Sequence, residues 1–449
     1  MGASKKTLVI GLDGVPYSLL NAYLEKGILP NLKNILSQGF TLKQMDASIP
    51  DVSSTSWTSF MTGVNPGEHG IFGFMELRPN SYKMSFPSLN DVQAPPIWDI
   101  LGGTVNRGSS TVYEKFKGRI NNKFRSIVLN IPQTFPALPM NGILSAGFVC
   151  PDLKKGTYPE SAYNYLKSMG YIPDVDSAKA AANPEAFFEE AFLSLDKRAE
   201  AYMHFLDNED WGLFIGVITE TDRVHHFFFD AALDANSRFH ERFILFYRKV
   251  DEIIGRLFNR FMEATGGRGL FMTMSDHGFT TVDKEVYFNN FLRAGGFLKI
   301  NGEREYFEQI DAGTRAFAMD PARIYVNLEG SYPLGAVRVS DREKTVAELK
   351  EALSSLVCNG RPVIKSIFTN AEIYSGKASV KGPDLVCLGH DGFDLKGNIK
   401  KQGVFGNSHF RGMHTRHDAH CVLPERVIGP ERLHIESLAE VILSEYKEV

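Results

Sequence analysis

Acidic and histidine residues recur directly after apolar runs that have the character of buried strands. Asp13 ends the run TLVIGLDG, Asp222 and His226 follow WGLFIGVI, and Asp276 and His277 follow GLFMTM. Asp222 and His226 are four residues apart, so one helical turn would place both on one face. Carboxylates and imidazoles together suit divalent metals such as zinc and manganese. The set predicts a metal site. Taken singly, Asp13 is equally typical of a helix cap, and His277 is more typical of a structural histidine than of a ligand.

A second feature with chemical potential is the segment PDVSSTSWTSFMTGVNPG. Its four consecutive hydroxyl residues open a short apolar run that stops at Thr62 and Gly63. Ser and Thr favour helix N-termini and Gly favours helix C-termini, so the segment predicts a short helix that presents hydroxyl groups at its start. Free N–H groups and the helix dipole at that end suit a phosphate-like anion. A serine there is either a helix cap or a nucleophile.

The third feature is a polar stretch near the C-terminus, over residues 406–420, which we expect to be a loop. It contains His409, His414, His417 and His420. One of them, near position 414, would complete a set of three aspartates and three histidines. Such a set is strong evidence for a metal site, whereas any one of its clusters is weak evidence.

The elements that must position these residues alternate between strands and helices. Residues 183–206 and 235–263 carry apolar side chains at three- and four-residue spacing, which predicts long helices that cover a sheet. Strand, polar cluster and helix follow one another several times, and ligands of open α/β sheets bind beyond the carboxyl ends of the strands. The fold class is therefore α/β, with a doubly wound, mostly parallel sheet. A dinucleotide-binding enzyme is disfavoured because the first strand is not followed by a GxGxxG turn.

A small α/β insertion is expected between the metal-ligand clusters and the C-terminal segment. Residues 284–297 and 342–356 predict helices, and several short apolar runs between 318 and 388 predict strands. We therefore expect three parts, listed here in chain order: a core α/β domain with the first metal-ligand clusters over 1–283, an insertion or cap region over 284–405, and a C-terminal core segment with the metal-ligand loop over 406–449. The insertion is a candidate lid that selects the substrate.

Bulk properties narrow the partners and the location. The net charge is −4 over 449 residues, so nothing points to bulk attraction for nucleic acid or anionic membranes. The four cysteines form no paired spacing, which favours a reducing compartment. The first strand begins at about Thr7, with no signal peptide before it, and no apolar run is long enough to span a bilayer. We expect a cytoplasmic protein.

The motifs together resemble one enzyme family along almost the whole chain. They are GLDG at 11–14, PDVSSTSWTSFMTGVNPGEHGI at 50–71, TETDRVHH at 219–226, SDHGF at 275–279 and GMH at 412–414. In this order they resemble the alkaline phosphatase superfamily, within it the type I phosphodiesterase/nucleotide pyrophosphatase branch. The resemblance implies an alkaline-phosphatase-like core and a hydrolase of phosphodiester or pyrophosphate bonds that acts on a small-molecule phosphodiester, nucleotide or other phosphoryl substrate. It also implies two divalent ions, zinc or alternatively manganese, and a covalent phosphoseryl intermediate.

The same resemblance assigns roles to individual residues. One ion would be held by Asp13, Ser53, Asp276 and His277, and the other by Asp222, His226 and His414. Ser53 takes the nucleophile position because it lies three residues after Pro50 and nine before Thr62, with Ser54 as the alternative. His414 follows Gly412 and Met413 as in the family, with His409, His417 and His420 as alternatives, and His225 is the alternative to His226.

Departures from the family pattern leave the substrate open. Ser56 stands where nucleotide pyrophosphatases carry an asparagine three residues after the nucleophile. A sulfatase is disfavoured because the segment lacks the Cys/Ser-x-Pro-x-Arg run. The alternatives kept are a phosphomonoesterase or phosphomutase of the same superfamily, and a catalytically silent binding relative.

Overall fold

The computed structural model describes residues 5–120, 123–302, 304–427 and 432–448, which fall into two compact units. The first unit comprises Met1–Asn65, Ser88–Phe279 and Phe410–Val449, and the second comprises Pro66–Pro87 and Thr280–His409. The second unit thus includes residues 66–87, which the sequence analysis assigned to the core. Tyr82 places them there, because it is buried in the apolar core of the second unit and donates a hydrogen bond to Asn327 Oδ1 at 2.8 Å.

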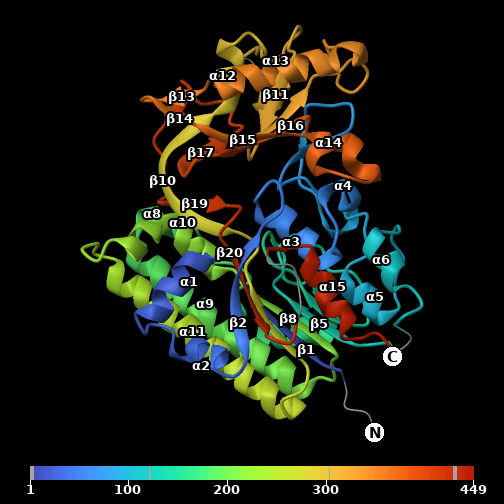
Figure 1. Cartoon of the computed structure of the whole chain (residues 1–449), viewed down its shortest axis with the longest axis vertical. Coiled ribbons are helices and arrows are strands. Elements are labelled where there is room, and N and C mark those ends of the chain that lie inside the picture. Colours follow the sequence, from blue (N-terminus) through green and yellow to red (C-terminus); the bar gives the residue numbers. More distant parts are fainter. Residues whose placement is uncertain (1–4, 121–122, 303, 428–431, 449) are drawn as a thin grey trace. The chain divides into compact units, whose positions relative to one another are not determined.

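The first unit is built on a nine-stranded, mostly parallel sheet, as the sequence predicted (Figure 1). Its order is β21 (Leu433–His434), β2 (Phe40–Asp46), β20 (Ala419–Pro424), β9 (Leu270–Met274), β1 (Thr7–Leu12), β8 (Leu213–Ile218), β5 (Ser126–Leu129), β6 (Gly142–Ser145) and β7 (Thr157–Tyr158). β20 is antiparallel to both of its neighbours, and β7 is antiparallel to β6. The central strands β9, β1, β8, β5 and β6 run parallel and are buried on both faces, which explains their continuous apolar sequences.

Helices cover both faces of this sheet. Leu8 and Ile10 of β1 point into an apolar core shared with one set of helices: α1 (Tyr17–Glu25), α2 (Pro30–Leu36), α7 (Glu160–Ser168), α8 (Ala178–Ala182), α9 (Pro184–Asn208), α10 (Glu220–Leu233) and α11 (His240–Thr265). Gly11 faces the opposite side, where a Cβ atom would lie 2.5 Å from the ring of Trp57. That side carries α3 (Ser53–Thr62), α5 (Ile97–Gly102), α6 (Thr111–Phe116) and α15 (Ser437–Ser444). The sheet is therefore doubly wound, as expected.

The second unit has its own sheets and its own apolar core. One four-stranded sheet has the order β11 (Ala316–Met319), β12 (Arg323–Val326), β16 (Leu385–Gly389) and β15 (Ile364–Thr369), and contacts α12 (Phe288–Ala294) and α13 (Arg342–Ser354). The remaining elements are α4 (Pro66–His69), β3 (Glu76–Leu77), β4 (Met84–Ser85), β10 (Gly278–Tyr287), β13 (Val357–Cys358), β14 (Arg361–Pro362), α14 (Asn370–Ile373), β17 (Gly392–Lys396) and β18 (Phe405–Gly406), with short 3-10 turns at 306–309, 339–341 and 377–381.

Two local predictions were wrong. Residues 284–287 are the end of β10 rather than the start of a helix, because they pair with β17 and β18, and α12 begins only at Phe288. The stretch 406–420 is not one loop, since it contains β19 (Gly412–Thr415) and the start of β20. His414 therefore lies on a strand, and His420 lies inside the central sheet.

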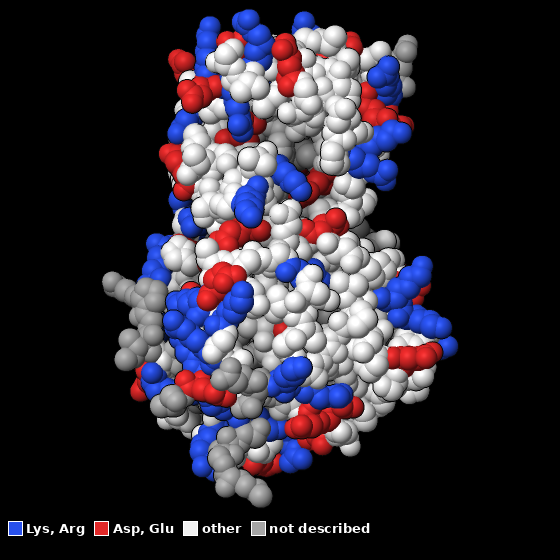
Figure 2. All heavy atoms as spheres, turned by 90° about the vertical axis from the view of Figure 1, so that its right-hand side faces the viewer, with Lys and Arg blue, Asp and Glu red and all other residues white. Residues whose placement is uncertain are grey.

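No helix among the described residues is long and apolar enough to cross a membrane. Basic and acidic side chains are interspersed over the face drawn in Figure 2, in keeping with the small net charge. All four cysteines are free.

Candidate active site

The register of the sheet brings the predicted ligand clusters to one edge. Leu12 at the end of β1 lies beside Ile218 at the end of β8, and Met274 at the end of β9 lies beside Gly11. The residues that follow these three parallel strands therefore meet beyond their carboxyl ends, as the sequence analysis expected. The hydroxyl of Thr221 fastens the next turn in place by donating a hydrogen bond to the Asp13 carbonyl oxygen at 2.6 Å.

Ser53 is the first residue of α3, and its hydroxyl faces the clusters rather than capping the helix. The N-cap residue is Val52, and no side chain caps this end. Ser53 Oγ lies 3.1 Å from His277 Nε2 and 3.4 Å from Asp13 Oδ1. Asp13 likewise does not cap a helix, because the N-cap of α1 is Pro16. Asp13 Oδ2 instead accepts a hydrogen bond from the Trp57 indole N–H at 3.3 Å.

Asp13, Asp276 and His277 form one buried cluster beside Ser53. Their ligand atoms all lie within 4.8 Å of one another, and none of the three residues is more than 3% exposed. Asp276 Oδ1 accepts the Gly14 backbone N–H at 3.0 Å, which leaves Oδ2 facing His277 Nε2 at 3.3 Å. His277 Nδ1 lies 3.0 Å from the Gly278 carbonyl oxygen, which can only accept. The proton is therefore on Nδ1, and the lone pair of Nε2 points into the cluster.

Asp222, His226 and His414 form the neighbouring cluster. Asp222 Oδ1 lies 3.4 Å from His226 Nε2 and 3.3 Å from His414 Nε2, and these two nitrogens are 3.1 Å apart. The first two turns of α10 place Asp222 and His226 on one face, as their spacing predicted. His414 Nδ1 lies 3.0 Å from the Asp51 carbonyl oxygen, so in the neutral imidazole its Nε2 also carries the lone pair. The clusters adjoin, since Asp222 Oδ1 is 3.9 Å from His277 Nε2.

The two clusters fit divalent metal ions. Within the described part of the chain, no donor hydrogen-bonds Asp276 Oδ2 or Asp222 Oδ1, although both atoms are buried. Carboxylate oxygens and nitrogen lone pairs that face each other repel unless a cation lies between them. Backbone carbonyls that hold the far nitrogen of His277 and His414 are the usual support of metal-binding imidazoles. Mixed oxygen and nitrogen donors match zinc or manganese.

The pKa values of Asp13 and Asp222 are shifted in opposite directions. Burial raises the pKa of Asp13 well above its usual value, and the adjacent Asp276 and Asp222 carboxylates raise it further. Burial also acts to raise the pKa of Asp222, but His226 and His414 outweigh it and hold that pKa well below its usual value. Negative charge is thus crowded around Asp13, which is the charge distribution that a bound cation would balance.

The alternative residues are engaged elsewhere. His225 donates from Nδ1 to the Gly14 carbonyl oxygen at 2.9 Å and accepts from Tyr247 Oη at 2.6 Å, and burial lowers its pKa to about 3. His420 donates to the Val15 carbonyl oxygen at 2.9 Å from inside β20. His417 pairs with Asp46 at 2.8 Å. His409 belongs to the second unit. The Ser54 hydroxyl is buried and has no hydrogen-bond partner among the described residues.

Some residues that shape the site were not anticipated from the sequence. Trp57 holds Asp13, and the carbonyls of Asp51 and Gly278 set the tautomers of two histidines. Arg223 donates to Asp222 Oδ2 at 3.1 Å. The signal for Arg223 was its place inside the TETDRVHH motif. The carbonyl contacts leave no mark in the residue types.

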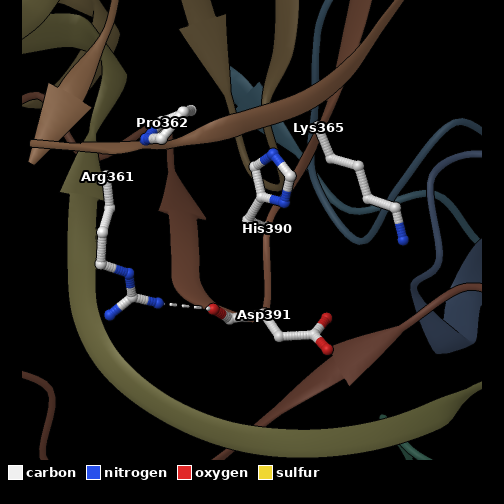
Figure 3. Close-up of a pocket in the computed structure, with 5 residues that line it drawn as sticks. All are labelled: Arg361, Pro362, Lys365, His390 and Asp391. Atoms are coloured by element: carbon white, nitrogen blue, oxygen red, sulfur yellow. Dashed lines mark hydrogen bonds between the residues drawn. The ribbon is translucent and has the colours of Figure 1, made fainter.

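A separate hollow lies within the second unit (Figure 3). Its volume is about 340 Å³, and it is lined by Arg361, Pro362, Lys365, His390 and Asp391. Arg361 donates to the Asp391 carbonyl oxygen at 3.3 Å and to Asp283 at 3.0 Å. None of the seven candidate site residues lines this hollow.

Solved structures of similar fold include a phosphonoacetate hydrolase and ectonucleotide pyrophosphatase/phosphodiesterases. Phosphonoacetate hydrolase from Sinorhizobium meliloti 1021, solved with phosphonoformate, has a TM-score of 0.61 and 13% identity, covering 99% of this chain and 96% of its own. Murine ectonucleotide pyrophosphatase/phosphodiesterase 5 has a TM-score of 0.54 and 13% identity, covering 98% and 95%. Its human counterpart has a TM-score of 0.52 and 15% identity over the same shares. At these identities the likeness establishes the fold.

No curated protein sequence matches the chain. The family model described as type I phosphodiesterase/nucleotide pyrophosphatase matches residues 7–417. This match confirms the resemblance seen in the motifs, and with it the alkaline phosphatase superfamily and the class of phosphodiesterase-like hydrolases. The chain belongs to the type I phosphodiesterase/nucleotide pyrophosphatase family.

Proposed function

We propose that the protein is a two-metal hydrolase of phosphodiester or pyrophosphate bonds that works through a phosphoseryl intermediate on Ser53. The observation that carries this proposal is the Ser53 hydroxyl at the start of α3, 3.1 Å from His277 Nε2 and 3.4 Å from Asp13 Oδ1. A serine hydroxyl becomes a good nucleophile only where its alkoxide is stabilised. The family assignment supports the reaction class.

The residues divide into two ligand sets in this proposal. Asp13, Asp276 and His277 would hold one ion together with Ser53 Oγ. Asp222, His226 and His414 would hold the other. When bound, two such ions supply positive charge to the attacking and leaving oxygens of an in-line displacement. Zinc is the first candidate because of the three imidazoles, and manganese is the second.

Ser53 carries out the first displacement. Its Oγ loses its proton to solvent and bonds to phosphorus while the bond from phosphorus to the leaving oxygen breaks, and that oxygen departs with the electron pair. Water then attacks the phosphoseryl group and releases phosphate or a phosphate monoester, which restores the Ser53 hydroxyl. The backbone N–H groups of Ser53 and Ser54, at the first turn of α3, donate to no backbone carbonyl among the described residues, so they are suited to hold a non-bridging oxygen.

The test compares hydrolysis of bis-p-nitrophenyl phosphate and p-nitrophenyl phosphate by chelator-stripped protein that is re-supplied with zinc or manganese. We expect turnover to depend on the added metal and to favour the diester. A preference for the monoester would replace the proposal with a phosphatase or mutase of the same superfamily. Protein that binds two ions but hydrolyses neither compound, nor nucleotide pyrophosphates, would contradict the proposal and favour a silent relative.

A further inference from the structure

Arg223 divides the two oxygens of the Asp222 carboxylate between separate tasks. Its Nη1 donates to Oδ2 at 3.1 Å, whereas Oδ1 faces His226 and His414 at 3.4 and 3.3 Å. Adjacent residues on a helix do not face each other, so this contact requires the arginine side chain to be turned back toward Asp222. Something outside α10 must hold it there.

Asp174 and Phe148 hold the guanidinium group. Arg223 Nε and Nη2 donate to the two Asp174 oxygens at 3.1 and 3.0 Å, which is a two-point contact of fixed geometry. The ring of Phe148 lies 4.0 Å from the guanidinium carbon and covers one face of it. The Arg223 side chain is 13% exposed, so the arrangement is largely shielded from water.

The segment that precedes Asp174 is held in turn by a buried arginine of α9. Arg198, whose side chain is 1% exposed, donates to Tyr171 Oη at 2.6 Å and to the carbonyl oxygens of residues 172 and 173 at 3.3 and 3.4 Å. The same guanidinium donates through Nε to both oxygens of Glu220 at 2.9 Å, two residues before Asp222 on α10. The contacts form a closed ring that joins α9, the segment 171–174 and the first turn of α10.

We propose that Arg223, held by Asp174, is a positioning residue that keeps Oδ2 of Asp222 occupied and presents Oδ1 to the metal ion shared with His226 and His414. The inference rests on the proposed function and adds a role to a residue outside the ligand set. An ordinary stabilising ion pair would need only Asp174. The third contact, to a ligand carboxylate, is the feature that connects this pair to the metal site.

Orientation and charge predict opposite effects when Arg223 is replaced. If Arg223 acts by orientation, its loss frees the carboxylate to rotate, and affinity for one ion falls by about 10- to 100-fold, as is typical for groups that support ligands. If only its charge mattered, removing a cation 3.1 Å from Asp222 would strengthen metal binding.

The experiment titrates metal-stripped protein with Zn²⁺ against a chromophoric chelator, and records the visible spectrum of the Co²⁺ form. For Arg223→Met we expect the affinity for the ion at Asp222, His226 and His414 to fall 10- to 100-fold, and the Co²⁺ spectrum to change. Arg223→Lys keeps the charge but cannot contact both carboxylates, so it should recover only part of the affinity. Asp174→Asn keeps the shape of the side chain and should weaken metal affinity about tenfold. This variant keeps the test usable if Arg223→Met fails to fold.

Arg107→Met is the matched control, because Arg107 is also 14% exposed and paired with a buried aspartate, Asp99, at 3.7 Å. It should lower the melting temperature without changing metal affinity. Unchanged or tighter metal binding by Arg223→Met would overturn the inference, as would a raised KM with normal metal affinity, which would make Arg223 a substrate contact. Wild-type protein that binds two ions but hydrolyses no phosphoryl compound would count against the proposed function alone, and wild-type protein that binds none would overturn both.

Discussion

Replacing Asp276 with asparagine should change stability in opposite directions with and without metal. The ligand atoms of Asp13 and Asp276 lie within 4.8 Å, where two unit charges repel by about 3.5 kcal/mol at an effective dielectric constant of about 20. Because the pKa of Asp13 is already raised, proton uptake relieves part of this repulsion. Metal-free Asp276→Asn should therefore be more stable than wild type by roughly 1–2 kcal/mol. Asparagine can still accept the Gly14 N–H that Asp276 Oδ1 accepts at 3.0 Å, so the change isolates the charge.

The metal-loaded comparison should reverse the order. Each ion present at about 1,000 times its dissociation constant stabilises the wild type by roughly 4 kcal/mol. For a chain of this size, 1 kcal/mol corresponds to about 1 °C in melting temperature. The assay is thermal unfolding of both proteins in chelator and in excess zinc. We expect the variant to melt about 1–2 °C higher in chelator and several degrees lower in zinc.

Asp251→Asn is the control for loss of a buried aspartate. Asp251 is 1% exposed and accepts the backbone N–H groups of Asn31 and Leu32 at 2.9 and 2.8 Å, at the start of α2. Its replacement should lower stability by about 1–3 kcal/mol whether or not metal is present. The reasoning is refuted if metal-free Asp276→Asn is the less stable protein, or if zinc stabilises it as strongly as wild type.

Three further predictions use other parts of the structure. Ser53→Ala should reduce turnover by roughly 10⁴-fold or more while metal content stays near wild type, and Ser54→Ala should not; the reverse result would move the nucleophile. Burial lowers the pKa of His420 in the folded protein to about 4. Below about pH 6.5 the unfolded chain binds a proton at His420 that the folded chain does not bind. The free energy of unfolding therefore falls by about 1.4 kcal/mol per pH unit from pH 6.5 down to pH 4. In urea titrations His420→Gln should therefore lose about 2 kcal/mol less than wild type between pH 6.5 and 5, and equal slopes would contradict this. Arg198→Met leaves the buried Glu220 charge unpaired and should cost about 3–5 kcal/mol, whereas Arg198→Met with Glu220→Leu should recover most of it by chemical denaturation; equal losses would show that the pair is not the cause.

The sheet and the ligand clusters could be predicted because their signals are local. A buried parallel strand such as β1 is a continuous apolar run, and Asp13 directly follows it. The spacing of Asp222 and His226 predicted that they share one face of a helix, because four residues make about one helical turn. The assignment of ligand roles to these residues stays a prediction, as do the cytoplasmic location and the division into three parts.

The errors arose where pairing with distant residues decides the structure. Residues 284–287 are a strand because β17, more than a hundred residues later, lies beside them. The residues that precede β20 are mostly polar and resemble a loop, yet β20 itself lies between β2 and β9 in the sheet. The motif contains Arg223, but its supporting role could not be predicted, because Asp174, its main partner, is 49 residues away in sequence. Composition and periodicity carry no information about such contacts.

The place of β20 has a consequence for how the protein is made. β2 (Phe40–Asp46) has only β20 and β21 as strand neighbours within the described residues, and both come from the last part of the chain. During synthesis β2 leaves the ribosome long before residue 419, and until then both β2 and the free edge of β9 present unpaired backbone groups. The central sheet is therefore completed only after β20 and β21 have been synthesised. We expect the nascent chain to depend on chaperones that shield open strand edges, and chains truncated before β20 to aggregate rather than to fold into a smaller enzyme.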